Sequence, residues 1–327
     1  MKESMFRFSI IIPVKPDGTV RALSHLAALA YPAEQFEIIV AEGSRPSRQR
    51  NRAAEQATGD ILFFLDDDSQ LQPDALTRLS LHFADPAVAA AGGPSLTPAT
   101  DSLLQQGFGA AFSSLMGGGA VRNRYRQAGG VRYTDDRELI LCNLAIRREL
   151  FLALGGLDER LYPNEENELM ERIARGGGKL VHDPQLPVFR SQRPTWRAFV
   201  RQLLTYGRGR GEQTRISGFG GIATVVPSIF VVYLLAGLFV RNPVYHLPLL
   251  CYLFLAGGSA LYEGIIRRRP ALVPLLLCIF PVIHLCYGYG TLLGLALPRF
   301  KKGVSSDANI HVRTVKQFAD IYQSTEV

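Results

Sequence analysis

A short apolar run that ends in three consecutive acids places the strongest constraint on how this chain folds. Ile61–Leu65 holds only large hydrophobic side chains, which is typical of a strand buried on both faces. Asp66, Asp67 and Asp68 follow at once, and adjacent like charges repel unless a cation or solvent compensates them. In an extended segment Asp66 and Asp68 point to one side and Asp67 to the other. The run therefore indicates either a divalent-cation site or an acidic surface turn.

Similar apolar runs recur over the first half of the chain, and segments with helical spacing separate them. The expected strands are 8–12, 36–40, 61–65, 88–92 and 139–146, and the expected helices are 21–29, 48–57, 73–83, 148–154 and 163–175. Gly155 and Gly156 are expected to end the helix at 148–154. Strands that alternate with helices predict an α/β fold with a mostly parallel central sheet. In such sheets, ligands bind beyond the carboxyl ends of the strands.

Polar residues follow three of the predicted strands and would meet at one edge of the sheet. These segments are Pro13–Lys15, Glu42–Ser44 and Asp66–Asp68, and their convergence favours the cation site over the surface turn. Glu165 and Glu166 open the helix that ends at Arg175. Acids in a first turn stabilise the helix dipole, and a carboxylate aimed at the same crevice could also act as a general base.

Five segments, in this order and spacing, resemble the family 2 glycosyltransferases. They are FSIIIPVK, IIVAEGS, GDILFFLDDDS, CNLAIRRELFLALGGLDE and EENEL. Arg201-Gln202 and the segment Tyr206–Arg210 are most similar to bacterial glycosyltransferases of succinoglycan-type exopolysaccharide synthesis. The resemblance implies a GT-A fold, a nucleotide-sugar donor with a UDP-sugar favoured, and Mg²⁺ or Mn²⁺ as the cofactor.

The resemblance also implies roles for individual residues. Asp66 and Asp68 would hold the metal on the donor diphosphate, and Glu166 would be the catalytic base, with Glu165 as the alternative. The residues implied in donor binding are Pro13, Lys15, Glu42, Arg50 and Asp67. Arg208 and Arg210 would contact the donor diphosphate or a lipid phosphate of the acceptor, or they form a cluster attracted to anionic headgroups.

The charge and hydropathy of the second half predict a membrane margin followed by membrane helices. The 327-residue chain has a net charge of +7, and seven arginines lie between residues 189 and 218 against the single acid Glu212. Three apolar stretches follow, at 222–240, 244–266 and 271–297, each long enough to span about 30 Å of hydrocarbon. A basic collar beside such stretches favours a membrane over nucleic acid as the partner. The predicted domains are 1–218, 219–298 and a polar tail, 299–327, with a short helix at 312–322.

The sequence therefore predicts a membrane-bound, metal-dependent, inverting glycosyltransferase with a lipid-linked or membrane-proximal glycan acceptor. Transfer to a simple lipid or polyprenyl phosphate is an alternative, and a non-catalytic membrane scaffold is another. The four scattered cysteines and the absence of an apolar core in Met1–Arg7 predict a reducing compartment without a cleaved signal. We expect a multi-pass protein of the bacterial inner membrane with its catalytic domain in the cytoplasm.

Overall fold

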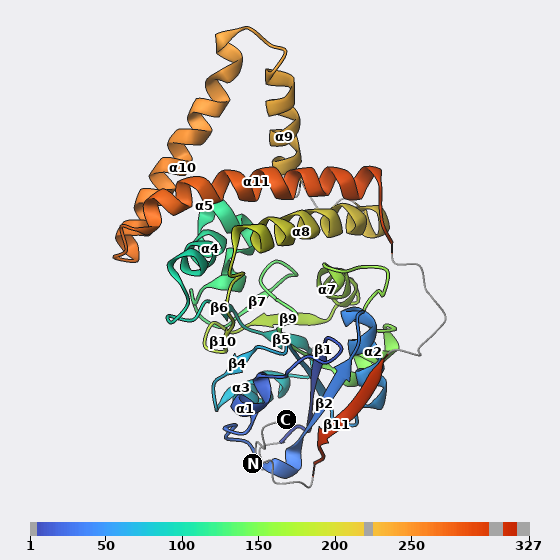
Figure 1. Cartoon of the computed structure of the whole chain (residues 1–327). Coiled ribbons are helices and arrows are strands. Elements are labelled where there is room, and N and C mark those ends of the chain that lie inside the picture. The colour runs from blue at the N-terminus through green and yellow to red at the C-terminus, as the bar shows by residue number, and fades with distance from the viewer. Residues whose placement is uncertain (1–4, 219–224, 301–309, 319–327) are drawn as a thin grey trace. The chain divides into compact units, whose positions relative to one another are not determined.

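A computed structural model describes residues 5–218, 225–300 and 310–318 and divides the chain into two compact units (Figure 1). Unit 1 is Met1–Leu96, Arg126–Arg190 and Lys301–Val327, and unit 2 is Thr97–Tyr125 and Ser191–Phe300. These units differ from the predicted domain ranges, because a segment from the first half joins the helices and the C-terminal segment joins the sheet.

Unit 1 contains a large mixed sheet. Its strands are β1 (Phe8–Val14), β2 (Phe36–Glu42), β3 (Ile61–Leu65), β5 (Val88–Gly92), β7 (Arg132–Thr134), β8 (Asn143–Arg147), β9 (Lys179–His182) and β11 (His311–Lys316), in the order β11-β2-β1-β3-β8-β5-β9-β7. β1 is parallel to β2 and β3, and β5 is parallel to β9. β7, β8 and β11 run antiparallel to their neighbours. The predicted α/β class is confirmed, with more antiparallel pairing than the alternating pattern indicates.

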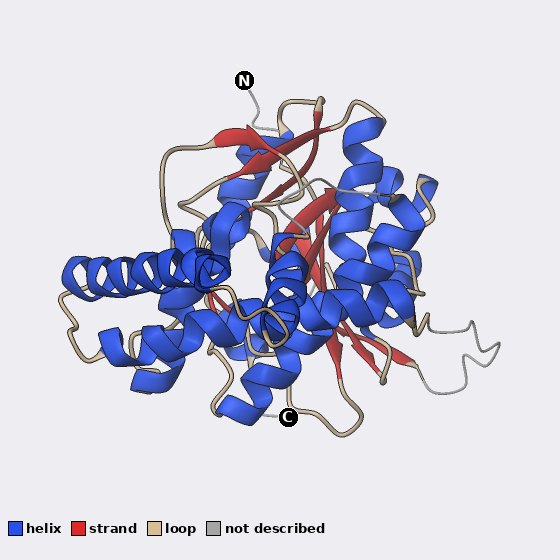
Figure 2. Ribbon diagram, turned by 90° about the horizontal axis from the view of Figure 1, so that it is seen from above, coloured by secondary structure: helices blue, strands red, loops and turns tan. Residues whose placement is uncertain are grey.

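Helices cover both faces of this sheet. They are α1 (Ala22–Leu26), η1 (Ala33–Gln35), α2 (Pro46–Gln56), α3 (Ala75–Phe83), α6 (Arg148–Ala153) and α7 (Glu165–Arg175). Successive residues of β3 enter opposite cores: Phe63 lies in the cluster that includes α1 and α3, and Phe64 in the cluster that includes α2, α6 and α7. A second, three-stranded sheet has the order β4 (Gln70–Leu71), β10 (Val188–Phe189) and β6 (Ser95–Leu96). Figure 2 distinguishes these strands from the helices by colour.

Two elements of the structure differ from the prediction. The apolar run 139–146 forms a strand only from Asn143, because the residues before it are in a turn. The predicted helix at 312–322 is wrong in its described part, since His311–Lys316 is a strand that pairs antiparallel with β2. The β-branched residues in HVRTVK fit an extended segment on a sheet edge. Residues 319–322 lie outside the described ranges.

Unit 2 is helical. Its elements are α4 (Leu103–Ser113), α5 (Leu115–Gly118), η2 (Gly119–Tyr125), α8 (Trp196–Ser217), α9 (Val226–Gly237), η4 (Pro243–His246), α10 (Leu247–Ile266) and α11 (Leu272–Ala296). Phe108 of α4 and Phe199 of α8 stack with ring centroids 3.7 Å apart, in a core that α10 and α11 complete. In the described part of the chain, Pro243–Ile266 and Leu272–Ala296 are long and apolar enough to cross a membrane. The predicted stretch 222–240 begins outside the described residues, and its described helix α9 has 12 residues.

Candidate active site

The carboxyl ends of β2, β1 and β3 lie side by side, as the alternating pattern predicts. Gln49 of α2 ties two of these ends together, because its Nε2 donates to the carbonyl oxygens of Val14 at 2.8 Å and Ala41 at 2.5 Å. The amide of Gly43 also donates to the carbonyl of Val14, at 2.9 Å. The ends of β1 and β2 are therefore held in a fixed relation to each other.

The residues predicted to line the nucleotide pocket lie at this edge. Pro13 is a buried residue of β1, and Lys15 follows the strand with an exposed side chain. Glu42 is the last residue of β2, and its Oε1 accepts a hydrogen bond from the amide of Asp17 at 3.2 Å. The structure brings these three residues to the edge where the acids of β3 emerge, and their role in donor binding stays a prediction.

Asp66 and Asp68 both contact the guanidinium group of Arg190. Arg190 Nη1 is 3.0 Å from Asp66 Oδ2, and Arg190 Nε donates to Asp68 Oδ1 at 2.8 Å. The more distant Arg21 Nη2 is 3.8 Å from Asp68 Oδ2, and its side chain is 74% exposed. Burial, followed by the charges of its two neighbours, raises the pKa of Asp67. The predicted pairing of Asp66 and Asp68 is therefore present, with a guanidinium between them.

A second arginine links the aspartates to the predicted base. Arg50 of α2 donates from Nη2 to Asp66 Oδ1 at 2.7 Å, and its Nη1 lies 3.6 Å from Glu165 Oε1. The Arg50 side chain is 5% exposed, so this contact is shielded from solvent. The acids at the end of β3 and at the start of α7 belong to one partly buried network of alternating charge.

The two acids at the start of α7 have different surroundings. Glu165 is 2% exposed and Glu166 is 9% exposed. Burial, reinforced by the charge of Glu166 and opposed by Arg50, raises the pKa of Glu165 to about 7. Among the described residues, Glu165 Oε2 has no hydrogen-bond partner. A buried carboxylate of this kind is costly to ionise and is characteristic of functional sites.

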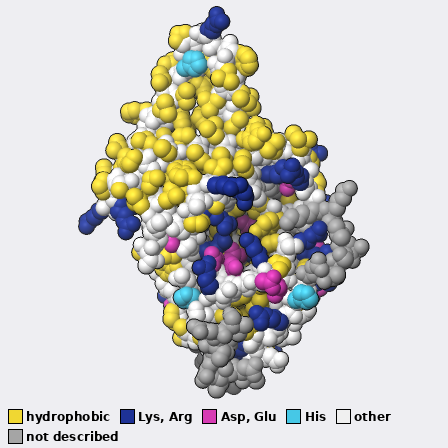
Figure 3. Space-filling model, in the orientation of Figure 1, with side chains coloured by type: hydrophobic (Ala, Val, Ile, Leu, Met, Phe, Trp, Pro, Cys, Tyr) yellow, Lys and Arg dark blue, Asp and Glu magenta, His cyan; other side chains and the backbone are white. Residues whose placement is uncertain are grey.

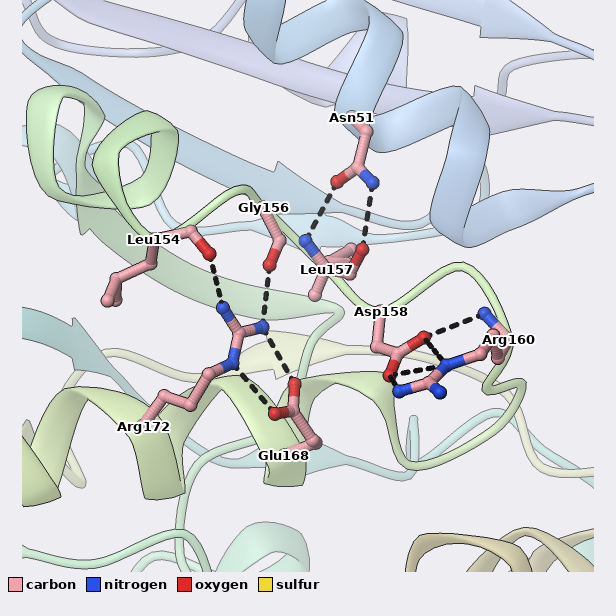
Figure 4. A network of polar contacts seen from close by, with 8 residues as sticks. All are labelled: Asn51, Leu154, Gly156, Leu157, Asp158, Arg160, Glu168 and Arg172. Atoms are coloured by element: carbon pink, nitrogen blue, oxygen red, sulfur yellow. Dashed lines mark hydrogen bonds and ion pairs between the residues drawn. The ribbon is translucent and has the colours of Figure 1, made fainter. Parts of the chain in front are cut away.

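A polar network fixes the loop that leads into α7 (Figure 4). Arg172 of α7 donates to the carbonyls of Leu154 at 2.6 Å and Gly156 at 2.7 Å, and it binds Glu168 through both carboxylate oxygens. Asn51 of α2 exchanges two 2.9 Å hydrogen bonds with the backbone of Leu157. Since Arg50 and Asn51 are neighbours on α2, these bonds set the position of α7 relative to the aspartates.

The glycines predicted to end α6 do so. Gly155 has φ +78° and Gly156 has φ +73°, which other residues adopt only with strain. A Cβ at Gly156 would also meet Asn51 Oδ1. The turn and the Asn51 contact therefore both require glycine at position 156.

The aspartate pair fits a hard divalent cation. Its two carboxylates already share a positive group, and Mg²⁺ is commonly held by one or two carboxylates together with substrate phosphates and water. Within the ranges that the structure describes, no group of three or more His, Cys, Asp or Glu side chains could hold a metal alone. A metal at Asp66 and Asp68 would therefore take its remaining ligands from substrate and solvent.

Two predicted residues lie in unit 2, and one important residue was not predicted. Arg208 of α8 pairs with Glu212 at 3.1 Å and also donates to the carbonyl of Leu297, and Arg210 donates to Gln213 at 3.0 Å. Arg190 was expected only as a member of the basic collar. Arg190 contacts two aspartates that lie 122 and 124 residues earlier in the chain. This contact depends on the pairing of β10 with β4 and β6, which no local sequence pattern indicates.

Comparison with known proteins finds a family match over part of the chain, which includes Asp66, Asp68 and Arg50. Residues 14–151 match the family described as Glycosyl transferase family 2. The pre-mycofactocin glycosyltransferase of two Mycobacterium tuberculosis strains, CDC 1551 and H37Rv, is 25% identical over 195 residues. This match covers 60% of the chain and 38% of the relative, so the chain spans less than half the length of these proteins.

The fold is also found among solved structures. The mannosyltransferase PcManGT from Pyrobaculum calidifontis, in complex with GDP-Man and Mn²⁺, superposes with a TM-score of 0.54 at 15% sequence identity. The superposition covers 89% of this chain and 87% of that one. At this identity the likeness concerns the fold, and it agrees with a GT-A-like α/β domain.

Proposed function

We propose that this chain, which carries a family 2 glycosyltransferase domain over residues 14–151, is a membrane-bound, metal-dependent, inverting glycosyltransferase. It would move a sugar from a nucleotide-sugar donor to a lipid-linked or membrane-proximal glycan. The observation that carries the proposal is the partly buried network in which Arg190 joins Asp66 to Asp68 and Arg50 joins Asp66 to Glu165. It combines acids for a metal, cations for a diphosphate and a candidate base.

The donor diphosphate would lie at the acidic end of β3. Asp66 and Asp68 would hold Mg²⁺ or Mn²⁺, which supplies electrostatic stabilisation of the leaving diphosphate. The guanidinium groups of Arg50 and Arg190 add positive charge at the same place, and their planar geometry suits phosphate oxygens. The Mn²⁺ and GDP-Man bound to PcManGT agree with this assignment. Pro13, Lys15, Glu42 and Asp67 would complete the donor side.

The acceptor hydroxyl would lose its proton to an acid of α7. We assign this step to Glu166 and a positioning role to Glu165, because Glu165 is the more buried of the two and lies against Arg50. Direct attack of the hydroxyl on the anomeric carbon forms the new glycosidic bond and breaks the bond to the diphosphate. A single displacement of this kind inverts the anomeric centre.

The membrane assignment is supported by the exposed apolar surface of unit 2. Leu238, Phe239 and Phe254 are 77%, 86% and 82% exposed. In Figure 3 hydrophobic side chains cover α9 and α10. Isolated exposed hydrophobic residues are normal on soluble proteins, but two helices covered by them favour contact with lipid. A bacterial inner membrane with the catalytic domain in the cytoplasm is the proposed location, and Arg208 and Arg210 would meet anionic phosphate there.

The test is sugar transfer by the purified full chain. Radiolabelled GDP-mannose, UDP-glucose and UDP-GlcNAc are offered with Mn²⁺ and a bacterial lipid extract, and the product is extracted into organic solvent. Asp68→Ala and Glu166→Gln should each abolish transfer while the protein stays folded. Glu171→Gln should retain sugar transfer, because Glu171 pairs with Arg175 on the same helix and takes no part in the site. Normal turnover by Asp68→Ala or Glu166→Gln would reject the role assigned to that residue.

A further inference from the structure

We infer that the chain enters and leaves the bilayer on the side of unit 1, with α9 and α10 as an inserted hairpin and α11 at the membrane surface. This inference rests on the proposed membrane association. The sequence leaves the number of spans open, and three full spans would place the two ends of the apolar region on opposite sides.

The C-terminal strand belongs to the sheet of unit 1. β11 pairs with β2 in the register His311 to Glu42 and Thr314 to Ile39. Lys316 is 1% exposed, and its Nζ donates to the carbonyls of Ala33 at 2.5 Å and Phe36 at 2.6 Å. A strand anchored in this way has to lie on the same side of a membrane as the rest of its sheet.

The chain also approaches the apolar region from the side of unit 1. The segment of unit 1 that precedes the apolar helices ends at Arg190, and α8 carries arginines at positions 197, 201, 208, 210 and 215. A helix with this charge is too costly to place in hydrocarbon. Since α8 precedes the apolar helices and β11 follows them, both ends of the apolar region lie on one side.

α11 is long enough to span a membrane but is packed along α8. Four glycines lie at this contact, spaced by four residues on each helix: Gly207 and Gly211 on α8, and Gly290 and Gly294 on α11. A Cβ on any of them would collide with the backbone of the opposite helix. Figure 1 shows the two helices running alongside each other. Because α11 is in backbone contact with the charged helix α8, both helices lie at the same depth, at the aqueous margin of the membrane.

Polar bonds hold the C-terminal end of α11 on α8. Arg215 Nη1 donates to the carbonyl of Leu295 at 2.6 Å, and Arg208 Nη2 donates to the carbonyl of Leu297. The amide of Arg299 donates to Glu212 Oε1 at 2.7 Å. The last carbonyls of α11 are therefore satisfied by arginines of α8, as expected for a helix end at the surface and not for a span that leaves on the far side.

The remaining apolar helices form a hairpin. Tyr233 of α9 and Tyr245 of η4, which leads into α10, donate to each other's backbone carbonyls at 2.8 Å, and the rings of Phe230 of α9 and Tyr252 of α10 lie 4.6 Å apart. At the other end of α10, Arg267 pairs with Glu263 and donates to Ser113 of α4, and Arg268 and Arg269 follow. Arginines at this end mark the side that stays in the cytoplasm. The 12 residues of α9 reach about 18 Å, less than the hydrocarbon thickness.

Two measurements on the full chain in bacterial membranes test the inference. Alkaline phosphatase and a green fluorescent protein are fused in turn before Met1 and after Val327, so that β11 stays intact. Both positions should give fluorescent fusions and inactive phosphatase. Separately, the single tryptophan is moved from position 196 (Trp196→Phe) to α10 (Phe254→Trp) or to the middle of α11 (Leu285→Trp). Deeply brominated lipids should quench the tryptophan of α10, and shallowly brominated lipids that of α11.

The possible outcomes distinguish a failure of the hairpin inference from a failure of the proposed membrane association. A chain that alkaline carbonate washes off the membrane would overturn both. A chain that stays in the membrane but has its two ends on opposite sides, or a tryptophan at position 285 quenched as deeply as one at 254, would overturn the hairpin alone.

Discussion

At the scale of single residues, the centre of the site is a set of acids held by two arginines. Arg190 takes the position between Asp66 and Asp68 that the proposed function gives to a divalent cation. The two cations cannot bind the same oxygens together. Arg190 should therefore compete with the metal until a diphosphate gives it another partner.

Replacement of Arg190 by glutamine should strengthen metal binding in the absence of donor. A charge-assisted contact contributes on the order of 1.5 kcal/mol, so Mn²⁺ affinity should rise by about tenfold. Titration of free Mn²⁺ by electron paramagnetic resonance measures this directly. Arg21→Gln is the control, because that exposed side chain lies 3.8 Å from the same aspartate. Equal Mn²⁺ affinity in wild type and Arg190→Gln would show that Arg190 does not occupy the metal position.

Glu165 should make the stability of the protein depend on pH. Its pKa is raised from 4.5 to about 7, so between these values the folded state keeps a proton that the unfolded state has lost. The free energy of unfolding should then fall as the pH rises through this window and level off above it, by at most about 3 kcal/mol from this group. Chemical denaturation of wild type and Glu165→Gln from pH 5 to 8 isolates the effect.

The comparison with Glu165→Gln removes the titration of all other groups, because they are common to both proteins. Wild type should lose stability relative to the variant as the pH rises. Glu171→Gln, which changes an acid on the exposed side of α7, should follow wild type throughout. Parallel curves for wild type and Glu165→Gln would mean that this carboxylate titrates normally.

At the scale of elements, the packing of α8 on α11 depends on glycine. A Cβ at Gly290 would collide with the carbonyl of Leu204, whereas a Cβ at Gly258 of α10 has no atom within 4 Å among the described residues. Gly290→Ala should therefore destabilise unit 2 by about 1–3 kcal/mol through overpacking. Gly258→Ala should be neutral or stabilise by up to about 1 kcal/mol, since alanine is the better helix former. Thermal unfolding in detergent compares the two, and a Gly290→Ala protein as stable as wild type would reject the close contact.

Local sequence patterns predicted most elements of unit 1, because the conformation of each of these segments follows from its own residues. β3 and β5 begin and end where the apolar runs 61–65 and 88–92 do, and the glycines at 155 and 156 end α6 as expected. The pattern failed for β11, because its strand conformation comes from pairing with β2, more than 250 residues earlier. The β-branched residues of HVRTVK suit a strand, but the partner strand that fixes this conformation cannot be recognised from the local sequence.

The sequence likewise predicted the part of the candidate site that follows from local patterns, and not the part that depends on tertiary contacts. The strand ends could be placed together because parallel strands share an edge, and this brought Asp66 and Asp68 near Glu42 and Lys15. The links through Arg50 of α2 and Arg190, which follows β10, depend on side chains that meet only in the folded chain. The assignments of individual residues to donor, metal and base remain predictions.

At the scale of the whole molecule, the sheet and the apolar helices serve one proposed reaction. Unit 1 would bind a water-soluble donor, and unit 2 would hold the chain at the membrane where a lipid-linked acceptor resides. β11 returns the C-terminal segment to the sheet after the apolar helices, which is why the membrane part can be a hairpin. The central claim is that the acidic end of β3 binds a nucleotide sugar together with a metal.

A thermal-shift experiment with the full chain in detergent tests that claim most directly. Wild type and Asp68→Asn are heated with GDP-mannose, UDP-glucose or UDP-GlcNAc, each with and without Mn²⁺. A donor at a hundred times its dissociation constant stabilises the folded state by about 2.7 kcal/mol, so one nucleotide sugar should raise the Tm of wild type by several degrees when Mn²⁺ is present. Asp68→Asn should show no such metal-dependent rise. An equal rise in Asp68→Asn, or no rise in wild type with any of the donors, would contradict the account.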